Sequence, residues 1–584
     1  MAPNNAGITT TITETDEVGT PIATYVYSES VDVDADAAAG RDEAGNNKRR
    51  RRNKVMGKGM TGMTGRKGRK GRVDVVSSSS LQPWSLSASS LLSSLMNVFL
   101  PAGYPHSVSS DYLEYQTYDS LQAFASSIAG LLSSRAVLQG VGVGDATASP
   151  TSALLLHILQ DSSGRIATIL FAHRVGTAIE PECKMYRLAA DVFNDAAMLL
   201  DCLSPLVGTR AARVAVLSGA GVLRALCGVA GGSSKASLSA HFARWGNLGE
   251  VNAKDSSQET IISLLGMLVG SLVVSHITTP SATWTALLLL LALHLATNYA
   301  AVRAVHMTSL NRQRANIVFS ALLGSDPELD VDSLKSGQYS YVEKEKKGKK
   351  EKGEEEEEEK EWKILRPEEV ARRERIFERD GMLRWTFESQ SSASPSSSSQ
   401  ILGSCRIGVP LKDLLFLLQK DSPFSISTSV SRSKSTSTSI DPHQPSLLPR
   451  LLDLFASESY LLYISVSASR TRTPNHVCNA AIVLKQNCTV HAQLKAWVHA
   501  LLAARVISSS SSREHVHVQK NRKNNADDHG EEEEDTFGIL SRTLAFLNEK
   551  RRFERYLRRL AQEAGWDLDV AALETRPGRR VRVG

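Results

Sequence analysis

The residues best suited to hold a ligand lie in a short polar segment, residues 253–260. It contains Lys254, Asp255, Gln258 and Glu259, which supply a cation, two carboxylates and an amide within two helical turns. A long apolar run follows the segment directly. Ionisable groups at the edge of apolar helices usually belong to functional sites, so we predict a ligand site here. The alternative is structural, with Lys254 forming an ion pair with Asp255 or Glu259.

The apolar run after this segment predicts a helical hairpin over residues 260–302. The run contains no Asp, Glu, Lys or Arg, and Pro280 divides it because proline cannot donate a helical N–H bond. The arms are residues 261–277 and 282–302, and a membrane span needs roughly 20 apolar residues. The second arm meets that length, and the first is at the short limit. We predict a membrane hairpin; the alternative is a hairpin buried in a soluble helical core.

Glycines mark the apolar helices. Gly266 and Gly270 have the small-xxx-small spacing that lets helices approach closely in lipid. Two further groups each follow an apolar helix and predict Gly-rich turns: Gly140, Gly142 and Gly144, then Gly228, Gly231 and Gly232. An internal repeat is one interpretation of the two groups, because duplicated halves with Gly-interrupted helices build the sites of many transporters.

Three polar residues beside apolar helices join the candidate ligand site: Asp145, His241 and Asn298. A separate pair, Asp191 and Asp195, lies one turn apart on the helix predicted over residues 182–203. Two carboxylates on one face could hold a metal or a proton. We expect a polar rim or ion pairing with Lys184 and Arg187 instead.

No pattern indicates catalysis. The histidines lack HExxH spacing, and neither a GxSxG elbow nor a phosphate loop of the GxxxxGK type occurs. The six cysteines lack CxxC pairs and are expected to be reduced thiols. The net charge of +6 is concentrated in tracts, so no nucleic-acid partner is expected. We expect a protein that is not an enzyme and holds no metal.

The predicted fold is mainly α: a membrane-associated helical bundle, followed by a small α+β module, with long disordered segments. The expected parts are a disordered basic tail (1–80), the helical core (81–320), a charged and Ser-rich insertion (325–400) and the α+β module (401–584) with disordered loops 421–446 and 507–535. Within the insertion, only residues 362–385 are expected to fold, as a helix. If translation began at Met56 rather than Met1, residues 56–80 would resemble an organelle transit segment, which leaves an organellar membrane open.

Local patterns predict further elements. Helices are expected over residues 118–138, 151–159 and 303–317, with a turn at 161–164. Two further helices are expected, residues 491–506 capped by Thr489 and residues 536–564 with a stop at Gly565. The last helix has a basic face (Arg551, Arg552, Arg555, Arg558, Arg559), and strands are expected over residues 460–465 and 480–485.

Several longer motifs occur in collinear order: Pro101–Val108, Asp111–Gln116, Gly140–Asp145, Lys184–Asp191, Gly228–Gly232, His241–Ala243, Ala253–Thr260, Asn298–Arg303 and Asn311–Arg314. Together they resemble the root UV-B sensitive (RUS) family, closely over residues 95–320 and loosely over 401–584. The basic tail and the charged and Ser-rich insertions look like departures from that family.

The resemblance implies membrane-associated helical proteins, linked in plants to root UV-B responses, seedling growth, auxin transport and vitamin B6 homeostasis, with some members in plastids. It implies no established reaction. We expect a non-enzymatic membrane protein that binds or moves a small metabolite, with a B6 vitamer as one candidate; the alternative is a membrane-associated scaffold or regulatory protein. Its expected partners are membrane lipid and either another RUS-family protein or a second copy. Pyridoxal phosphate as cofactor would need a Schiff-base lysine and a phosphate cup, and Lys254 is the lysine to test.

Overall fold

The computed structural model describes most of the chain from residue 98 onward and three segments before it. The described residues are 9–15, 21–31, 69–78, 98–141, 150–336, 362–387, 398–420, 447–468, 476–509 and 528–583. Contacts divide the chain into two compact units, residues 1–108 and 109–584. Asp145, Gly142, Gly144, the basic run at 48–52, Met56 and the loop at 421–446 lie outside the described residues.

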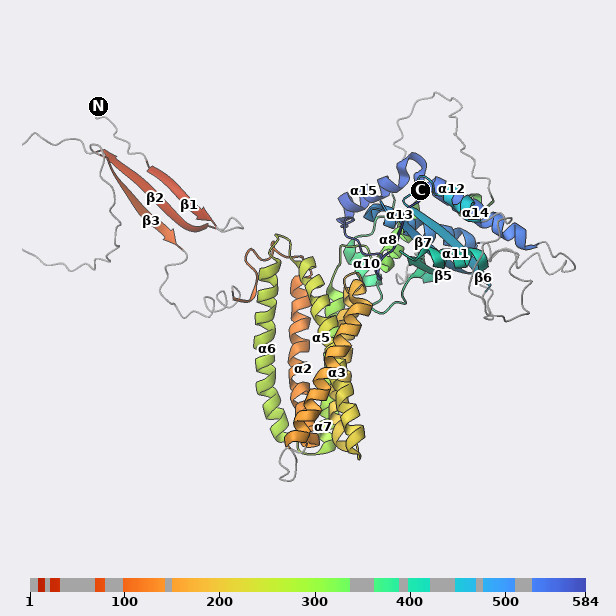
Figure 1. The fold of residues 1–584 in the computed structure, drawn as a ribbon. Helices are drawn as coiled ribbons and strands as arrows, with labels where there is room; N and C mark the ends of the chain where they lie inside the picture. The colour runs from red at the N-terminus through yellow and green to blue at the C-terminus, as the bar shows by residue number, and fades with distance from the viewer. Residues whose placement is uncertain are drawn as a thin grey trace, which may run out of the picture. The chain divides into compact units, whose positions relative to one another are not determined.

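The first unit contains an antiparallel sheet. Its strands are β1 (Thr9–Thr15), β2 (Pro21–Val31) and β3 (Arg69–Ser78), in the order β1-β2-β3 (Figure 1). The prediction of a disordered tail over residues 1–80 was wrong for these segments. Their β-branched and aromatic residues favour strands, but composition averaged over 80 residues concealed such short runs.

The second unit begins with a bundle of long helices (Figure 1). They are α2 (Tyr112–Val141), α3 (Pro150–Ile179), α4 (Cys183–Leu203), α5 (Arg210–Phe242), α6 (Leu248–His276) and α7 (Pro280–Ala304), with a 3₁₀ turn, η1 (Ser204–Leu206), after α4. Helix α2 packs against α4, α6 and α7, and α5 packs against α3 and α4. The predicted hairpin is therefore present as α6 and α7, and α2 contacts both arms.

Two turns predicted from glycine are helical in the structure. The turn expected at residues 161–164 lies within α3, and the one expected after Cys227 lies within α5, which runs through Gly228, Gly231 and Gly232. Gly164 lies against α5, where a Cβ would be 3.5 Å from the Gly221 carbonyl oxygen. Since the second Gly-rich group forms no turn, the predicted repeat of a helix followed by a turn is absent from α5.

Capping residues explain where α7 and α8 begin. Pro280 is the first residue of α7, and the Thr279 hydroxyl accepts a hydrogen bond from Ala282 N at 3.3 Å. The helix expected over 303–317 is interrupted: α7 ends at Ala304, and α8 (Arg312–Ser325) starts after Asn311, whose Oδ1 accepts from Arg314 N at 2.9 Å. Asn311 caps a new helix, which the apolar pattern alone did not indicate.

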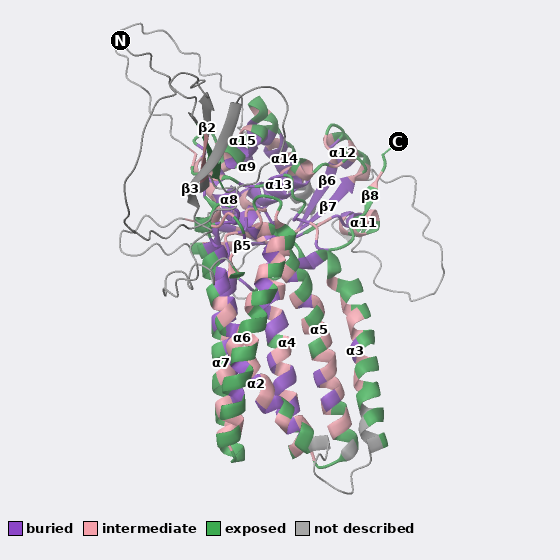
Figure 2. Ribbon diagram, turned by 90° about the vertical axis from the view of Figure 1, so that its left-hand side faces the viewer, coloured by how far each residue is buried: buried purple, intermediate pink, exposed green. Residues whose placement is uncertain are grey.

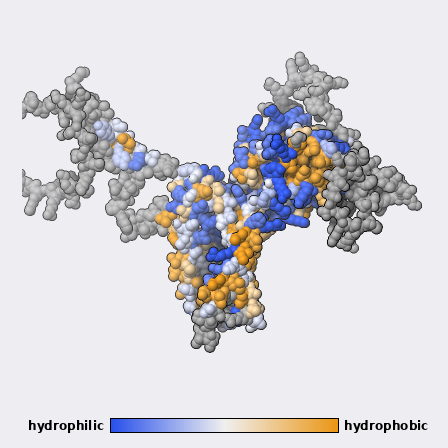
Figure 3. All heavy atoms as spheres, viewed as in Figure 1, coloured by the Kyte–Doolittle hydropathy of each residue, from blue (hydrophilic) through white to orange (hydrophobic). Residues whose placement is uncertain are grey.

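The outside of the bundle is apolar. Among the described residues, four helices are long and apolar enough to cross a membrane: Tyr112–Gln139, Ala211–Phe242, Leu248–His276 and Pro280–Ala304. A hairpin buried in a soluble core would bury its leucines, yet Leu268, Leu272 and Leu289 are 58%, 63% and 67% exposed. Exposed segments run along α3 and α6 (Figure 2), and apolar side chains gather on the face of the bundle seen in Figure 3. The bundle surface therefore favours the membrane interpretation.

The rest of the second unit is an α+β module, as predicted. Its helices are α8, α9 (Val331–Ser336), α10 (Pro367–Arg373), α11 (Leu411–Lys420), α12 (Leu447–Leu454), α13 (Val490–Ser509), α14 (Asp528–Asn548) and α15 (Arg552–Ala564), with a 3₁₀ turn, η6 (Glu549–Arg551). Its strands are β4 (Met382–Phe387), β5 (Ser398–Ile407), β6 (Tyr460–Ala468), β7 (His476–Lys485) and β8 (Arg580–Val581). The strand order is β4-β5-β7-β6, with β8 beside β7. Strand β7 runs parallel to β5 and β8 and antiparallel to β6.

Helix α13 is capped by Thr489, as predicted. It buries Trp497, whose indole N–H donates to Asn316 of α8 at 2.9 Å.

Two helices predicted in this module are shorter than expected. Residues 362–385 are helical only over α10 and continue into β4. The helix expected over 536–564 breaks at Lys550 and Arg551, which have φ values of 48° and 53°. Arg552, assigned to an exposed basic face, is buried and paired with Glu328 and Asp326. Gly565 ends α15 at φ 74°, as predicted.

Candidate functional site

Helix α4 carries ionisable side chains into the bundle interior. Arg187, Asp191 and Asp195 recur about one turn apart, so they share a face. Asp201 follows further along the helix, and all four are buried. That face meets α2, α5 and α7, which are candidate spans. Ionisable residues inside a bundle with an apolar outside are costly and usually functional.

Arg187 holds the first cluster together. Its Nη2 lies 2.6 Å from Asp119 Oδ1 of α2, and its Nε donates to the Tyr115 hydroxyl at 3.3 Å. Gln122 donates a further hydrogen bond to Asp119 at 2.9 Å. The guanidinium is thus fixed by two residues of a neighbouring helix.

A second cluster lies further along α4. His294 Nδ1 of α7 is 2.7 Å from Asp195 Oδ1, and His294 Nε2 is 3.8 Å from Asp191 Oδ2. Asn298 Nδ2 donates to that same Asp191 oxygen, and Arg187 Nη1 lies 3.8 Å from Asp191 Oδ1. The pairing expected between Arg187 and Asp191 is present, but both acids are buried, so the polar rim was wrong.

The predicted polar segment forms the N-terminal turns of α6. Asp255 is buried and accepts a hydrogen bond from Gln116 of α2. Lys235 of α5 lies 2.8 Å from Asp255 Oδ2 and 2.6 Å from Glu259 Oε2, whereas Lys254 was the cation expected to pair with them. The signal that could have identified Lys235 is its isolation as a charged residue in a small, apolar part of α5. Lys254 and Gln258 are half-buried on the same helix.

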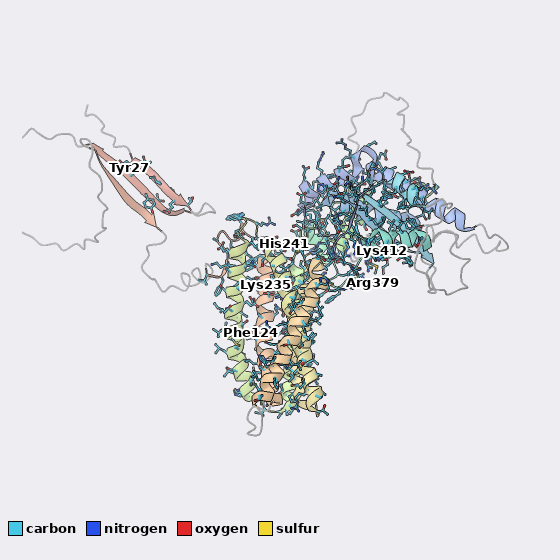
Figure 4. All side chains as sticks on the ribbon, in the orientation of Figure 1. Tyr27, Phe124, Lys235, His241, Arg379 and Lys412 are labelled. Carbon is cyan, nitrogen blue, oxygen red and sulfur yellow. The ribbon has the colours of Figure 1, made fainter. Side chains whose placement is uncertain are left out.

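His241 lies at the end of the bundle, beyond Lys235 on α5 (Figure 4). Its Nε2 is 3.0 Å from Asp111 Oδ2, which also accepts from His306 N at 2.6 Å. Burial raises the pKa of Asp111, but the hydrogen bond and charge of His241 outweigh this effect and hold that pKa well below its usual value.

A cavity of about 430 Å³ opens beside His241. Its wall combines the end of α5, the segment that joins α7 to α8, and residues after α15, including Ser237, Arg244, Ser309, Asp567 and Val570. This volume lies in the range of small-molecule sites. Of the predicted site residues that the structure describes, His241 is the one that lines this cavity.

The remaining predicted residues lie apart from the cavity. Asn298 belongs to the Asp191 cluster, deeper in the bundle. Gly266 and Gly270 pack against α2, and Gly231 faces Ala190 of α4, where a Cβ would lie 3.5 Å away. Gly140 lies near the C-terminal end of α2, and nothing lies within 4 Å of a Cβ added at Gly228 or Gly232.

The polar series continues toward the other end of α4. Asp201 pairs with Arg224 of α5 and accepts from the Ser133 hydroxyl at 2.8 Å. Buried polar groups therefore follow one another through the bundle from Asp111 to Asp201. Sequence reasoning anticipated the pairing of Arg187 with an acid of α4, but it saw Asp111 and Gln116 only as parts of motifs.

Another polar cluster joins the bundle to the α+β module. Glu374 lies 2.6 Å from Lys184 Nζ and 2.8 Å from Arg314 Nη1, and all three are buried. Burial raises the pKa of Glu374, but the two cations outweigh this effect and lower it overall. Arg303 at the end of α7 donates to the Glu374 carbonyl oxygen. Arg312 lines a second cavity, of about 350 Å³, with Arg174, Tyr186, Arg379 and Arg576.

Two family models match the chain. One, described as a vitamin B6 photo-protection and homoeostasis domain, matches residues 85–326, and the other, described as root UVB sensitive protein, C-terminal, matches residues 450–577. The chain belongs to the root UV-B sensitive family. The RUS resemblance read from the motifs is thereby confirmed.

Curated relatives match part of the chain. "RUS family member 1" of Dictyostelium discoideum is 44% identical over 229 residues, which are 38% of this chain and 43% of that protein. "Protein root UVB sensitive 3" of Arabidopsis thaliana is 35% identical over 243 residues, 41% of this chain and 55% of that protein. "Protein root UVB sensitive 2, chloroplastic", also of Arabidopsis thaliana, is 27% identical over 41% of this chain and 55% of that protein. The chain thus matches about half the length of these relatives. No solved structure matches it.

The family description names vitamin B6, and pyridoxal phosphate is the cofactor that this would imply. Neither cavity is lined by a lysine, and Lys184 and Lys235 are paired with carboxylates. These residues do not fit a Schiff-base site for pyridoxal phosphate. Among the described residues, no group of three or more His, Cys, Asp and Glu side chains could hold a metal ion.

Proposed function

We propose that this RUS-family protein is a non-enzymatic membrane protein that binds or moves a small, vitamin B6-related metabolite. One observation carries the proposal: a series of buried ionisable groups lies inside a bundle whose outer surface is apolar. Lipid would cover the leucines of α6 and α7, and the polar groups inside would be available to a solute.

The cavity beside His241 is the proposed entry site. A metabolite there would meet the imidazole of His241 and the guanidinium of Arg244, groups that bind hydroxyl, carboxylate or phosphate oxygens. The Lys235 cluster lies along α5 behind the cavity and would be the next polar contact. A vitamer would be held by non-covalent contacts, in keeping with the absence of lysine from the cavity wall.

The membrane concerned is proposed to be organellar, on the analogy of the chloroplastic relative. The exposed faces of α3 and α6 would contact lipid, or another RUS-family protein within the same membrane. A scaffold without a small-molecule ligand is the competing function, and it would use these same faces.

Mass spectrometry of the full chain, purified from membranes in detergent, tests the proposal. We expect a B6 vitamer to co-purify and radiolabelled pyridoxal 5′-phosphate or pyridoxine to bind. His241→Gln should weaken binding about tenfold, equivalent to ~1.4 kcal/mol. His276→Gln is the matched control, because His276 is exposed at the opposite end of the hairpin.

The scaffold alternative predicts that no small molecule binds. A defined protein complex that contains no small molecule, together with no measurable binding of either vitamer, would overturn metabolite binding. If the His241 and His276 variants bind the vitamer equally weakly, the cavity beside His241 is not the binding site.

A further inference from the structure

The core of the bundle contains more buried negative than positive charge. Arg187 faces Asp119 and Asp191, and His294 faces Asp191 and Asp195. The cluster therefore combines three carboxylates with one guanidinium. Protonation of His294 adds one positive charge and still leaves one carboxylate unbalanced. All five side chains are buried, and an unbalanced ion in such surroundings costs several kcal/mol.

Among the described residues that face His294, there is no further cation. On α4 it faces Asp191, Asp195 and, more distantly, Arg187, and on α2 the nearest charge of the cluster is Asp119. Cys227 of α5 faces the same acids, and Arg224, nearly one turn before it on α5, pairs with Asp201. Helix α10 meets α7 near Arg303, about 13 Å along the helix from His294.

Two acceptor atoms in this cluster also lack donors. Asp195 Oδ2 and Asn298 Oδ1 are buried, and neither has a hydrogen-bond partner among the described residues. Each of these oxygens can therefore accept a hydrogen bond from a proton bound within the cluster. A metal ion would be another source of positive charge, but the described residues offer no group of three ligands that could hold one.

We infer that the His294–Asp191–Asp195 cluster is a buried proton-binding site, which takes up a proton from water and returns it without any other bond change. If the protein moves a metabolite, as proposed above, the proton is the ion to which that movement is coupled. Uptake balances the charge of the cluster when it is closed to water, and release restores the excess negative charge when water enters.

Infrared spectroscopy of the full chain in lipid nanodiscs, as a function of pH and with no metabolite added, tests this inference. The wild-type protein should show the carbonyl stretch of a buried carboxylic acid at neutral pH. Asp195→Asn should remove most of that band, and His294→Gln should shift the pH at which it titrates. Asp201→Asn is the control, because Asp201 lies on the same helix and is equally buried, but is neutralised by Arg224.

An identical band in the wild type and in folded Asp195→Asn, or equal loss in Asp201→Asn, would overturn the inference. If Asp195→Asn does not fold, Asp195→Glu keeps the acid at this position. A shift in the frequency of the band would then assign the band to residue 195, and an unshifted band would overturn the inference. The titration needs no metabolite, so its failure would leave metabolite binding standing. Conversely, failure to co-purify a vitamer would leave the proton site standing.

Discussion

Gly266 of α6 and Ser127 of α2 lie in closer contact than any larger residue would allow. A Cβ on Gly266 would be 2.7 Å from Ser127 Cβ and 3.0 Å from the Phe124 carbonyl oxygen. One turn later, a Cβ on Gly270 would lie 3.2 Å from Ile128 Cα. The small-xxx-small motif therefore seats α6 on α2, the helix that also contributes Gln116 to the Asp255 cluster.

Replacing Gly266 with alanine should separate the two helices. We expect Gly266→Ala to lower the free energy of unfolding by about 1–3 kcal/mol, because the added methyl overpacks the contact. Gly232→Ala is the control. Nothing lies within 4 Å of its Cβ, so relief of helical glycine should stabilise the protein by roughly 0.5–1 kcal/mol. Thermal unfolding in detergent measures both, and equal responses would contradict the α2–α6 contact.

Glu374 should be essential for the junction between the bundle and the α+β module. Glu374→Gln leaves Lys184 and Arg314 buried without their carboxylate and should cost about 3–5 kcal/mol at neutral pH. Glu563→Gln, which removes a surface pair with Arg559, should leave stability unchanged. Denaturant unfolding of the full chain distinguishes the two variants.

The Glu374 effect should also depend on pH. Its pKa is lowered in the folded state, so its stabilisation is complete above its ordinary pKa of about 4.3 and is lost as the pH falls through the lower folded value. The difference between the wild type and Glu374→Gln should therefore narrow below about pH 4. A difference that stays constant from neutral to acid pH would contradict the ionised pairing.

His499 should make the α+β module sensitive to mild acid. Burial lowers the pKa of His499 to about 3, and its ring is held by the Tyr460 hydroxyl at 3.0 Å and by Thr543. The unfolded chain takes up the proton near pH 6.5 and the folded chain does not, so stability should fall below that pH by up to ~1.4 kcal/mol per unit. His499→Gln should remove this slope between about pH 6.5 and 5. His491→Gln, at an exposed site on the same helix, should keep the slope; its loss there would assign the effect elsewhere.

Local signals in the sequence predicted much of the fold. The charge-free run and Pro280 located α6 and α7, and Thr489 marked the start of α13. These signals act within one or two turns of the chain. Glycine led to the prediction of turns at residues 161–164 and after Cys227, but both segments are helical. Contacts between helices stabilise them there, and such contacts leave no local pattern in the sequence.

The candidate site was only partly predictable for the same reason. Asp255 was identified from its polar neighbours, but its cation, Lys235, comes from the preceding helix. Arg552 reads as part of a basic face until Asp326 and Glu328 are placed beside it. Ion pairs between residues more than 200 positions apart depend on tertiary structure, and no spacing pattern in a single sequence reveals them.

Carbonate extraction of membranes that contain the tagged full chain tests the central claim most directly. The claim is that the bundle crosses a lipid bilayer, with Leu268 and Leu272 of α6 in contact with lipid and the polar series inside. The account predicts that the protein stays in the membrane pellet with an integral marker at alkaline pH. Release of the protein into the supernatant with a peripheral marker would contradict it.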